Sequence, residues 1–210
     1  MDIILFGMQG AGKGTQGTIM AKKYNLAIFD TGAQLRALIQ TDSLLAEKVK
    51  LIMNAGKLVP NEVVMELIEN FMEANKSGGI LFDGLPRNKE QEESFNSLIS
   101  KHSRNLKGIY IDLSHEEAVK RLLGRRMCEK CKSIYPIAYS NDNCEKCGGN
   151  LVTRPDDNLD SIKTRLDTFK KETLPVIENY EKAGILTRID GQQSIEKVSE
   201  DIFQALGKCF

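Results

Sequence analysis

The sequence predicts an α/β fold in which a parallel sheet is covered by helices on both faces. Short apolar runs of strand length alternate with longer stretches of helical periodicity along most of the 210 residues. The first apolar run leads directly into a glycine-rich turn and then into a helix. One insertion that contains four cysteines interrupts this alternation at residues 124–157. We therefore expect one α/β core with small inserted subdomains.

Composition limits the possible partners. Lysine plus arginine and aspartate plus glutamate both total 29, so no net charge favours a nucleic acid or a membrane surface. The longest apolar runs have the length of a strand, and we expect none to span a membrane. Only Met1 and Asp2 precede the first expected strand, so we expect no signal peptide and a cytoplasmic location.

Residues 7–15 have the pattern of a phosphate-binding loop. They lie between an apolar run at 3–6 and a helix expected to reach Tyr24. Glycines let successive backbone N–H groups point at a phosphate chain, and the start of the helix adds its positive dipole end. Lys13 adds a full charge, although Gly14 separates it from the hydroxyl of Thr15. We conclude that the chain binds a nucleotide phosphate.

The rest of the chain continues the alternation of strands and helices. Further strands are expected at 27–29, 80–82, 108–113 and 186–189. Helices are expected at 31–39, 44–53, 60–71, 89–99, 115–123, 159–180 and 194–206. Strands separated by helices indicate parallel strand pairing.

Local signals mark several helix boundaries. Asp30 or Thr31 is suited to cap a helix, and Pro60 is expected at the first position of another. Residues 114–117 read as a capping box. Pro175 is expected to interrupt or bend the long helix at 159–180.

The insertion contains two Cys-x2-Cys pairs, spaced for tetrahedral metal coordination: Cys128, Cys131, Cys144 and Cys147. Disulfides are the alternative, but the expected compartment is reducing. A redox pair would need one such motif rather than two. We expect structural zinc, because four thiolates leave no open coordination position. Cys209 is expected to be a free thiol.

Charged residues at turns and motif ends suggest phosphoryl transfer. The arginines in such places are Arg36, Arg87, Arg121, Arg125, Arg154 and Arg165. The planar guanidinium group can bind two phosphate oxygens at once. Asp83 follows a buried strand at its carboxyl end, where parallel sheets bind ligands, and a carboxylate there suits water-bound magnesium.

Several motifs together resemble those of the adenylate kinase family. They are Gly-Lys-Gly-Thr-Gln at 12–16, Thr31-Gly32 followed by Arg36, Asp-Gly-Leu-Pro-Arg at 83–87 followed by Gln91, Gly-Arg-Arg at 124–126, and Arg-Pro-Asp-Asp at 154–157 followed by Arg165. The match covers nearly the whole chain in order. The departures are Gln9 in place of proline, Leu85 in place of phenylalanine, and Asp30 and Ala33 on either side of Thr31-Gly32.

This resemblance implies a monomer that interconverts ATP plus AMP with two ADP, using magnesium. It implies a core made of residues 1–29, 60–123 and 158–210, an AMP-binding subdomain at 30–59 and a zinc-binding lid at 124–157. The alternatives are a kinase of CMP or UMP, and a non-enzymatic P-loop or zinc-ribbon module that binds nucleotides.

The resemblance also implies a role for each site residue. Catalysis would depend on Lys13, Arg87, Arg125, Arg154 and Arg165. ATP would contact Gly10, Ala11, Gly12, Lys13, Gly14, Thr15, Arg121, Arg125 and Gln193, with Arg121 stacked on the adenine. AMP would contact Thr31, Gly32, Arg36, Lys57, Leu58, Val59, Gly84, Arg87, Gln91, Arg154 and Arg165, with Thr31 and Gln91 beside the base. Thr15 and Asp83 would hold magnesium through water.

Overall fold

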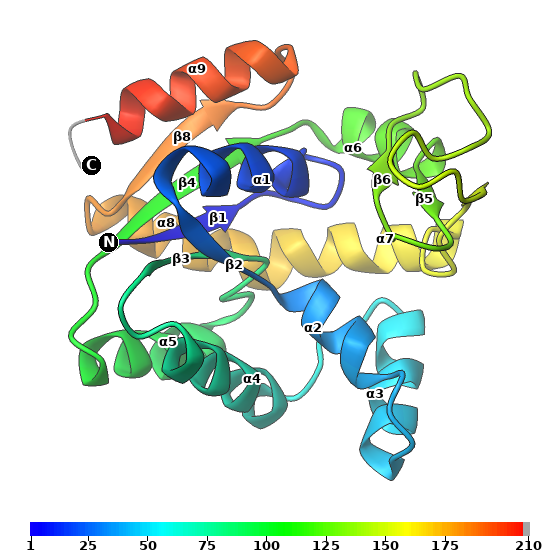
Figure 1. The fold of residues 1–210 in the computed structure, drawn as a ribbon. Coiled ribbons are helices and arrows are strands. Elements are labelled where there is room, and N and C mark those ends of the chain that lie inside the picture. Colours follow the sequence, from blue (N-terminus) through cyan, green and yellow to red (C-terminus); the bar gives the residue numbers. More distant parts are fainter. Residues whose placement is uncertain (208–210) are drawn as a thin grey trace.

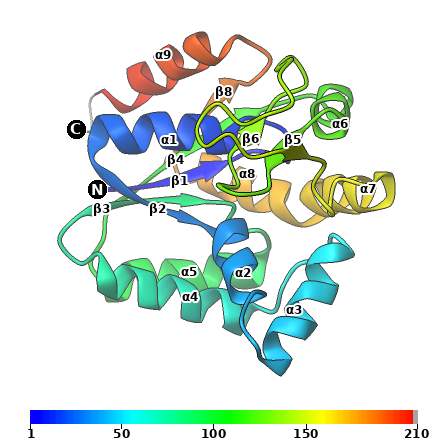
Figure 2. The same ribbon diagram turned by 45° about the vertical axis from the view of Figure 1, so that its right-hand side comes forward.

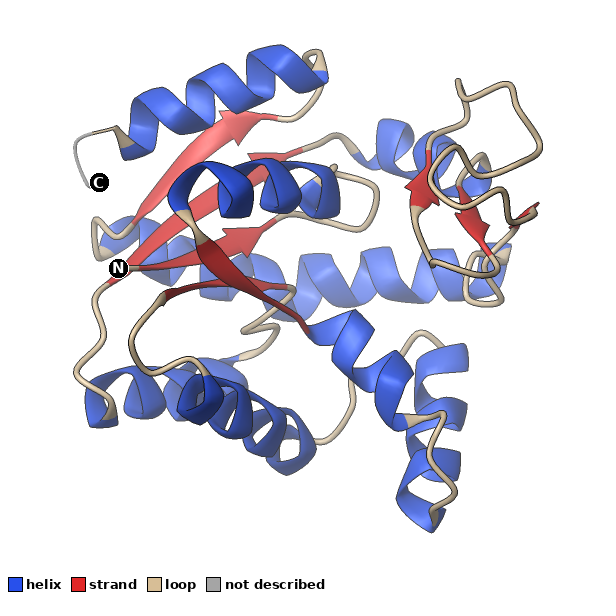
Figure 3. Cartoon of the chain, viewed as in Figure 1, coloured by secondary structure: helices blue, strands red, loops and turns tan. Residues whose placement is uncertain are grey.

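The computed structural model describes residues 1–207, so the prediction for Cys209 lies outside the described residues. Five parallel strands form the central sheet in the order β2-β3-β1-β4-β8. Their bounds are β1 (Asp2–Phe6), β2 (Leu26–Asp30), β3 (Gly79–Asp83), β4 (Leu106–Asp112) and β8 (Leu186–Asp190). Figures 1 and 3 show this sheet between layers of helices, which confirms the predicted fold class.

Strand β1 is buried on both faces, and its side chains alternate between two cores. Ile4 and Phe6 join the core on one face of the sheet, whereas Ile3 and Leu5 join the core on the other. A continuous apolar run is therefore required here, rather than an alternation of apolar and polar residues. The phosphate-binding loop follows this most buried strand.

Two groups of helices cover the two faces. The core that contains Ile4 includes residues of α2 (Thr31–Leu38), α3 (Leu44–Asn54), α4 (Asn61–Ala74), α5 (Lys89–Lys101) and α8 (Leu174–Lys182). The core that contains Ile3 includes residues of α1 (Lys13–Tyr24), α6 (His115–Leu123), α7 (Leu159–Thr168) and α9 (Ile195–Leu206). Figure 2 shows that α2 and α3 project from the main body as an arm.

The cysteine-rich insertion forms a small antiparallel sheet that sequence patterning did not predict. Its strands are β5 (Arg126–Cys128), β6 (Ile134–Tyr135) and β7 (Leu151–Val152), in the order β6-β5-β7. Strands of two or three residues are too short to show a period of two. Their core consists of Cys128, Tyr135 and Cys144, with Tyr139 and Leu151 packed against it.

The interruption predicted at Pro175 is confirmed, because a π-helical turn (Phe169–Thr173) separates α7 from α8 and the proline lies in the first turn of α8. Two other helix predictions need correction. Pro60 is the N-cap of α4 and not its first residue. The capping box is half formed, because Ser114 accepts from the Glu117 N–H while the Glu117 carboxylate pairs with Arg121.

Among residues 1–207, none of the helices combines the length and the apolar character needed to cross a lipid bilayer.

Candidate functional site

The loop between β1 and α1 surrounds the side chain of Lys13, which is half-buried. Gly10 and Gly12 have φ angles of 89° and 91°, which other residues rarely adopt. The Lys13 ammonium donates to the carbonyl oxygens of Gly7 (2.8 Å) and Met8 (3.2 Å). Burial lowers the pKa of Lys13, and the charge of Asp83 opposes this shift. Both acceptors are uncharged carbonyl oxygens, so they leave the positive charge of Lys13 available to an anion bound in the loop.

Two carboxylates end the neighbouring strands β2 and β3. Asp30 and Asp83 are direct partners in the parallel register, so both lie at the carboxyl edge of the sheet. Burial raises the pKa of Asp83 to about 6; the charge of Lys13 opposes this shift and that of Asp30 adds to it. A carboxylate beside the phosphate loop offers the hard oxygen that hydrated magnesium prefers, and Thr15 lines the same cleft. The residues present therefore fit a magnesium ion.

The two residues expected beside the acceptor base already have partners in the chain. The Thr31 hydroxyl donates to the backbone carbonyl of Asp83 (2.9 Å), so only its lone pairs remain for a ligand. Gln91 accepts through Oε1 from the backbone N–H of Arg87 (2.9 Å). These bonds fix both side chains, and they leave the Gln91 amide nitrogen as the donor for a base.

Two glycines of the sequence motifs make room for arginines. A Cβ on Gly32 would lie 2.8 Å from Nη1 of Arg36, and a Cβ on Gly84 would lie 2.9 Å from Nη2 of Arg87. The Arg87 side chain donates to the Gly84 carbonyl, and burial lowers the pKa of Arg87. Arg36 lies 3.9 Å from Asp30, at the base of the α2–α3 arm. Both glycines are therefore needed to seat a cation at the sheet edge.

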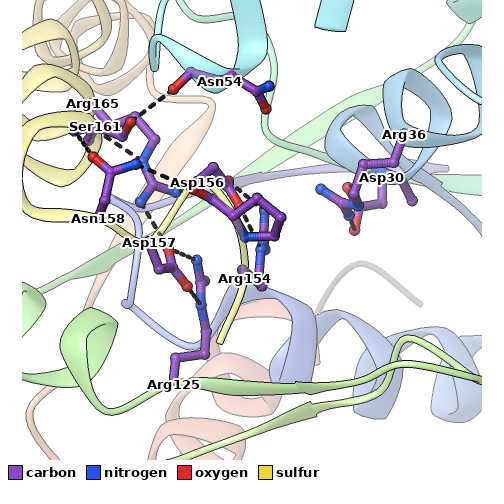
Figure 4. A network of polar contacts seen from close by, with 12 residues as sticks. Asp30, Arg36, Asn54, Arg125, Arg154, Asp156, Asp157, Asn158, Ser161 and Arg165 are labelled. Atoms are coloured by element: carbon purple, nitrogen blue, oxygen red, sulfur yellow. Dashed lines mark hydrogen bonds and ion pairs between the residues drawn. The ribbon is translucent and has the colours of Figure 1, made fainter. Parts of the chain in front are cut away.

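Three arginines near the lid are held by two aspartates (Figure 4). Arg125 donates to both oxygens of Asp157, at 2.8 and 2.7 Å. Arg154 forms the same two-bond contact with Asp156, at 2.9 and 2.6 Å. Arg165 bonds to both aspartates, at 3.1 Å to Asp156 and 2.7 Å to Asp157. Sequence analysis singled out the arginines but assigned no role to their carboxylate partners.

The far end of the cleft is formed by α6 and by the turn before α9. Arg121 donates through Nε to Glu117 (2.8 Å) and through Nη2 to the carbonyl of Gly191 (3.2 Å). Gln193 donates to the carbonyl of Asp190 (3.1 Å) and to the carboxylate of Asp201 (2.9 Å). The planar guanidinium of Arg121 is thus fixed beside the turn and can support a flat base.

One cleft of about 1100 Å³ brings these groups together. Every nucleotide-site residue predicted from the sequence lines it, from the phosphate loop, the arm and the sheet edge to the lid and the turn before α9. Sequence analysis missed several other lining residues, among them Leu35, Met53, Val64, Glu117, Ile134 and Ile137. Leu35, Met53 and Val64 followed ordinary core periodicity, and Ile134 and Ile137 lie in the aperiodic insertion, so no local signal set these apolar residues apart.

The four cysteines of the insertion meet as predicted. Their sulfur atoms all lie within 4.8 Å of one another. The shortest separations are 3.5 Å between Cys128 and Cys147 and 3.4 Å between Cys131 and Cys144, far longer than a disulfide bond. In a tetrahedral zinc site with bonds of about 2.3 Å, the sulfurs lie roughly 3.8 Å apart. The arrangement fits a four-thiolate metal site and not a pair of disulfides.

Comparisons with known proteins agree with this geometry. A family model described as adenylate kinase matches residues 5–185. An adenylate kinase from Caldanaerobacter subterraneus is 39% identical over 212 residues, covering 98% of this chain and 96% of the relative. Adenylate kinases from Staphylococcus aureus and Staphylococcus epidermidis are each 36% identical over 212 residues, covering 98% of this chain and 99% of the relative.

Proposed function

The chain belongs to the adenylate kinase family and interconverts ATP plus AMP with two ADP, and we propose that it does so within the single cleft described above. The observation that carries this proposal is the convergence of a phosphate loop, two carboxylates and the predicted arginines on one cavity. Phosphoryl transfer requires alignment of the two nucleotides and neutralisation of charge more than covalent chemistry. This set of groups supplies both.

The donor nucleotide occupies the end of the cleft formed by the phosphate loop and α6. The backbone amides of residues 10–15 and the Lys13 ammonium bind the phosphates of ATP. The adenine stacks on Arg121 beside the turn that carries Gln193. The contacts of Arg121 with Glu117 and Gly191 support this assignment, because they fix the guanidinium plane before the base arrives.

The acceptor nucleotide occupies the end formed by the sheet edge and the arm. Arg36 and Arg87 bind the phosphate of AMP, and residues 57–59 and Gly84 form the walls around it. The adenine lies beside Thr31 and Gln91. The Gln91 amide nitrogen donates to a ring nitrogen of the base, since its oxygen is bonded to the Arg87 backbone.

The transferred group passes between these ends, close to the lid arginines. Arg125, Arg154 and Arg165 exchange their aspartate partners for phosphate oxygens as the lid closes. Closure of residues 124–157 over the core (1–29, 60–123 and 158–210) and the AMP-binding arm (30–59) excludes water, which would otherwise accept the phosphoryl group.

Two metals complete the proposal. Adenylate kinases use magnesium with ATP, and Asp83 and Thr15 would hold the ion through its bound waters. Bound magnesium neutralises phosphate charge and orients the phosphate chain. The four cysteines would hold zinc, whose binding folds the lid. Reduced thiolates of this kind suit the cytoplasm, and we propose that the protein works there as a monomer.

A panel of acceptors tests the assignment. With magnesium and ATP, we expect AMP to be preferred over CMP, UMP and GMP by at least about tenfold in kcat/KM, the scale of one or two hydrogen bonds to a base edge. ADP formation measures the result. Equal turnover of CMP or UMP would favour a pyrimidine nucleotide kinase, whereas salt-dependent binding of DNA without turnover would favour a non-enzymatic module.

A further inference from the structure

The side chain of Gln16 connects two helices that are far apart in the sequence. Its amide nitrogen donates to the backbone carbonyl of Ile195 at 2.8 Å, and its oxygen accepts from the hydroxyl of Ser199 at 2.7 Å. Gln16 is 3% exposed and Ser199 is 8% exposed. Figures 1 and 2 show α1 and α9 side by side along the sheet. Apolar packing alone would hold this helix pair together, so a buried amide with two bonds needs a separate explanation.

Each end of this connection adjoins a different part of the cleft. Gln16 directly follows Thr15, the last residue of the phosphate loop. Ile195 is the first residue of α9 and directly follows the turn at 191–194. Gly191 and Gln193 of that turn line the cleft, as does Ile195. The bond from Gln16 to the Ile195 carbonyl therefore fixes the position of the turn relative to the phosphate loop.

We propose that Gln16, oriented by Ser199, is a positioning residue that sets the distance between the phosphate-binding and base-binding parts of the donor site. The inference rests on the donor site assigned above. An adenosine triphosphate must place its phosphates on residues 10–15 and its base against Arg121 at the same time. Arg121 is itself bonded to the carbonyl of Gly191, so a displacement of the turn also moves the base platform.

Ser199 is the more informative residue to change. Its hydroxyl lies 2.7 Å from the Gln16 oxygen and 2.9 Å from the Ile195 carbonyl, and it has one proton to donate. The Ile195 carbonyl already accepts a hydrogen bond from Gln16, so we expect the Ser199 hydroxyl to donate its proton to the Gln16 oxygen. Without it, a buried acceptor is left unpaired and the amide is driven to reorient, which releases the turn. The Ser199→Ala change leaves the phosphate loop itself intact.

The test compares ligands that use one or both parts of the donor site. Affinities for ATP and for inorganic tripolyphosphate are measured by calorimetry for the wild type, Ser199→Ala and Ser199→Thr. Ser161→Ala is the matched control, because Ser161 is also a buried serine and its hydroxyl bonds to the carbonyl of Asn54 (2.8 Å) on the acceptor arm. Gln16→Met repeats the test from the other side of the connection.

We expect Ser199→Ala to bind ATP about fivefold or more weakly and to bind tripolyphosphate within about twofold of the wild type. Ser199→Thr should restore the ATP affinity, and Ser161→Ala should leave both affinities unchanged. Equal losses for ATP and tripolyphosphate, or no loss for either in both Ser199→Ala and Gln16→Met, would overturn the inference. A wild-type protein that binds ATP no more tightly than tripolyphosphate would instead refute the assigned donor site.

Discussion

Replacing Asp83 with asparagine should make the unliganded protein more stable. The folded-state pKa of Asp83 is about 6 because of burial, compared with 3.8 for an unperturbed aspartate. Because the folded pKa is the higher one, ionising the group at neutral pH costs folding free energy, and this cost disappears as the pH falls from about 6 toward 4. A difference of about two pKa units corresponds to roughly 3 kcal/mol at about pH 7 and to about half of that at about pH 5. Asparagine keeps the shape and removes the charge, so the variant should gain these amounts.

Urea unfolding in EDTA, without nucleotide, measures the gain at both pH values. Asp167→Asn, on the exposed side of α7, is the control and should change the free energy of unfolding by less than about 0.5 kcal/mol. The Asp83→Asn protein should also lose most of its activity, because the carboxylate is assigned to the magnesium waters. A stability gain that is absent at about pH 7, or that does not shrink at about pH 5, would refute the electrostatic reasoning.

The remaining predictions concern the arginines and the metal of the lid. Arg87→Lys and Arg125→Lys keep the charge but lose the planar fork, so kcat/KM should fall about a hundredfold or more while circular dichroism stays unchanged; a loss within about threefold would place the residue outside the site. Metal analysis should find about one zinc per chain, as expected for one four-thiolate site. The double change Cys144→Ser and Cys147→Ser should lower the Tm clearly, because zinc binding is linked to folding of the lid. Activity well below melting should stay within about tenfold, since four thiolates leave no coordination position for a substrate. Complete loss of activity in a folded cysteine variant would show that the metal positions the nearby arginines.

Most of the fold was predictable because the inner strands β1, β3 and β4 of the central sheet are largely buried on both faces. Continuous apolar runs such as residues 3–6 and 80–82 are required there, and glycines or capping residues separate them from the helices. The phosphate loop was equally clear, because its glycines and lysine are local in sequence. Patterns that depend only on neighbouring residues in the sequence therefore predicted the structure well.

Features that depend on tertiary contacts were not predictable. The π-helical turn precedes Pro175, where the N–H of Leu174 bonds to the carbonyl of Phe169 and the helix widens before the proline. The lid strands depend on the meeting of four cysteines rather than on a periodic pattern. Arg125 and Asp157 form an ion pair although they are 32 positions apart in the sequence, so no local motif predicts it.

The partners of the cations divide the site into two electrostatic classes. At the floor of the cleft, Lys13 and Arg87 donate to backbone carbonyls, and neither forms a direct ion pair within residues 1–207, although the charges of Asp83 and Asp30 act on both. Arg125, Arg154 and Arg165 instead share the carboxylates of Asp156 and Asp157, which offset two of their three charges. An incoming phosphate therefore gains most from the floor, where no ion pair must be broken, and gains less from the lid until the aspartates are displaced. The same carboxylates keep three clustered guanidinium groups from repelling one another while the cleft is empty. In the proposed mechanism, Arg125 and Arg154 of the lid and Arg165 of α7 are thus held in place before a nucleotide binds.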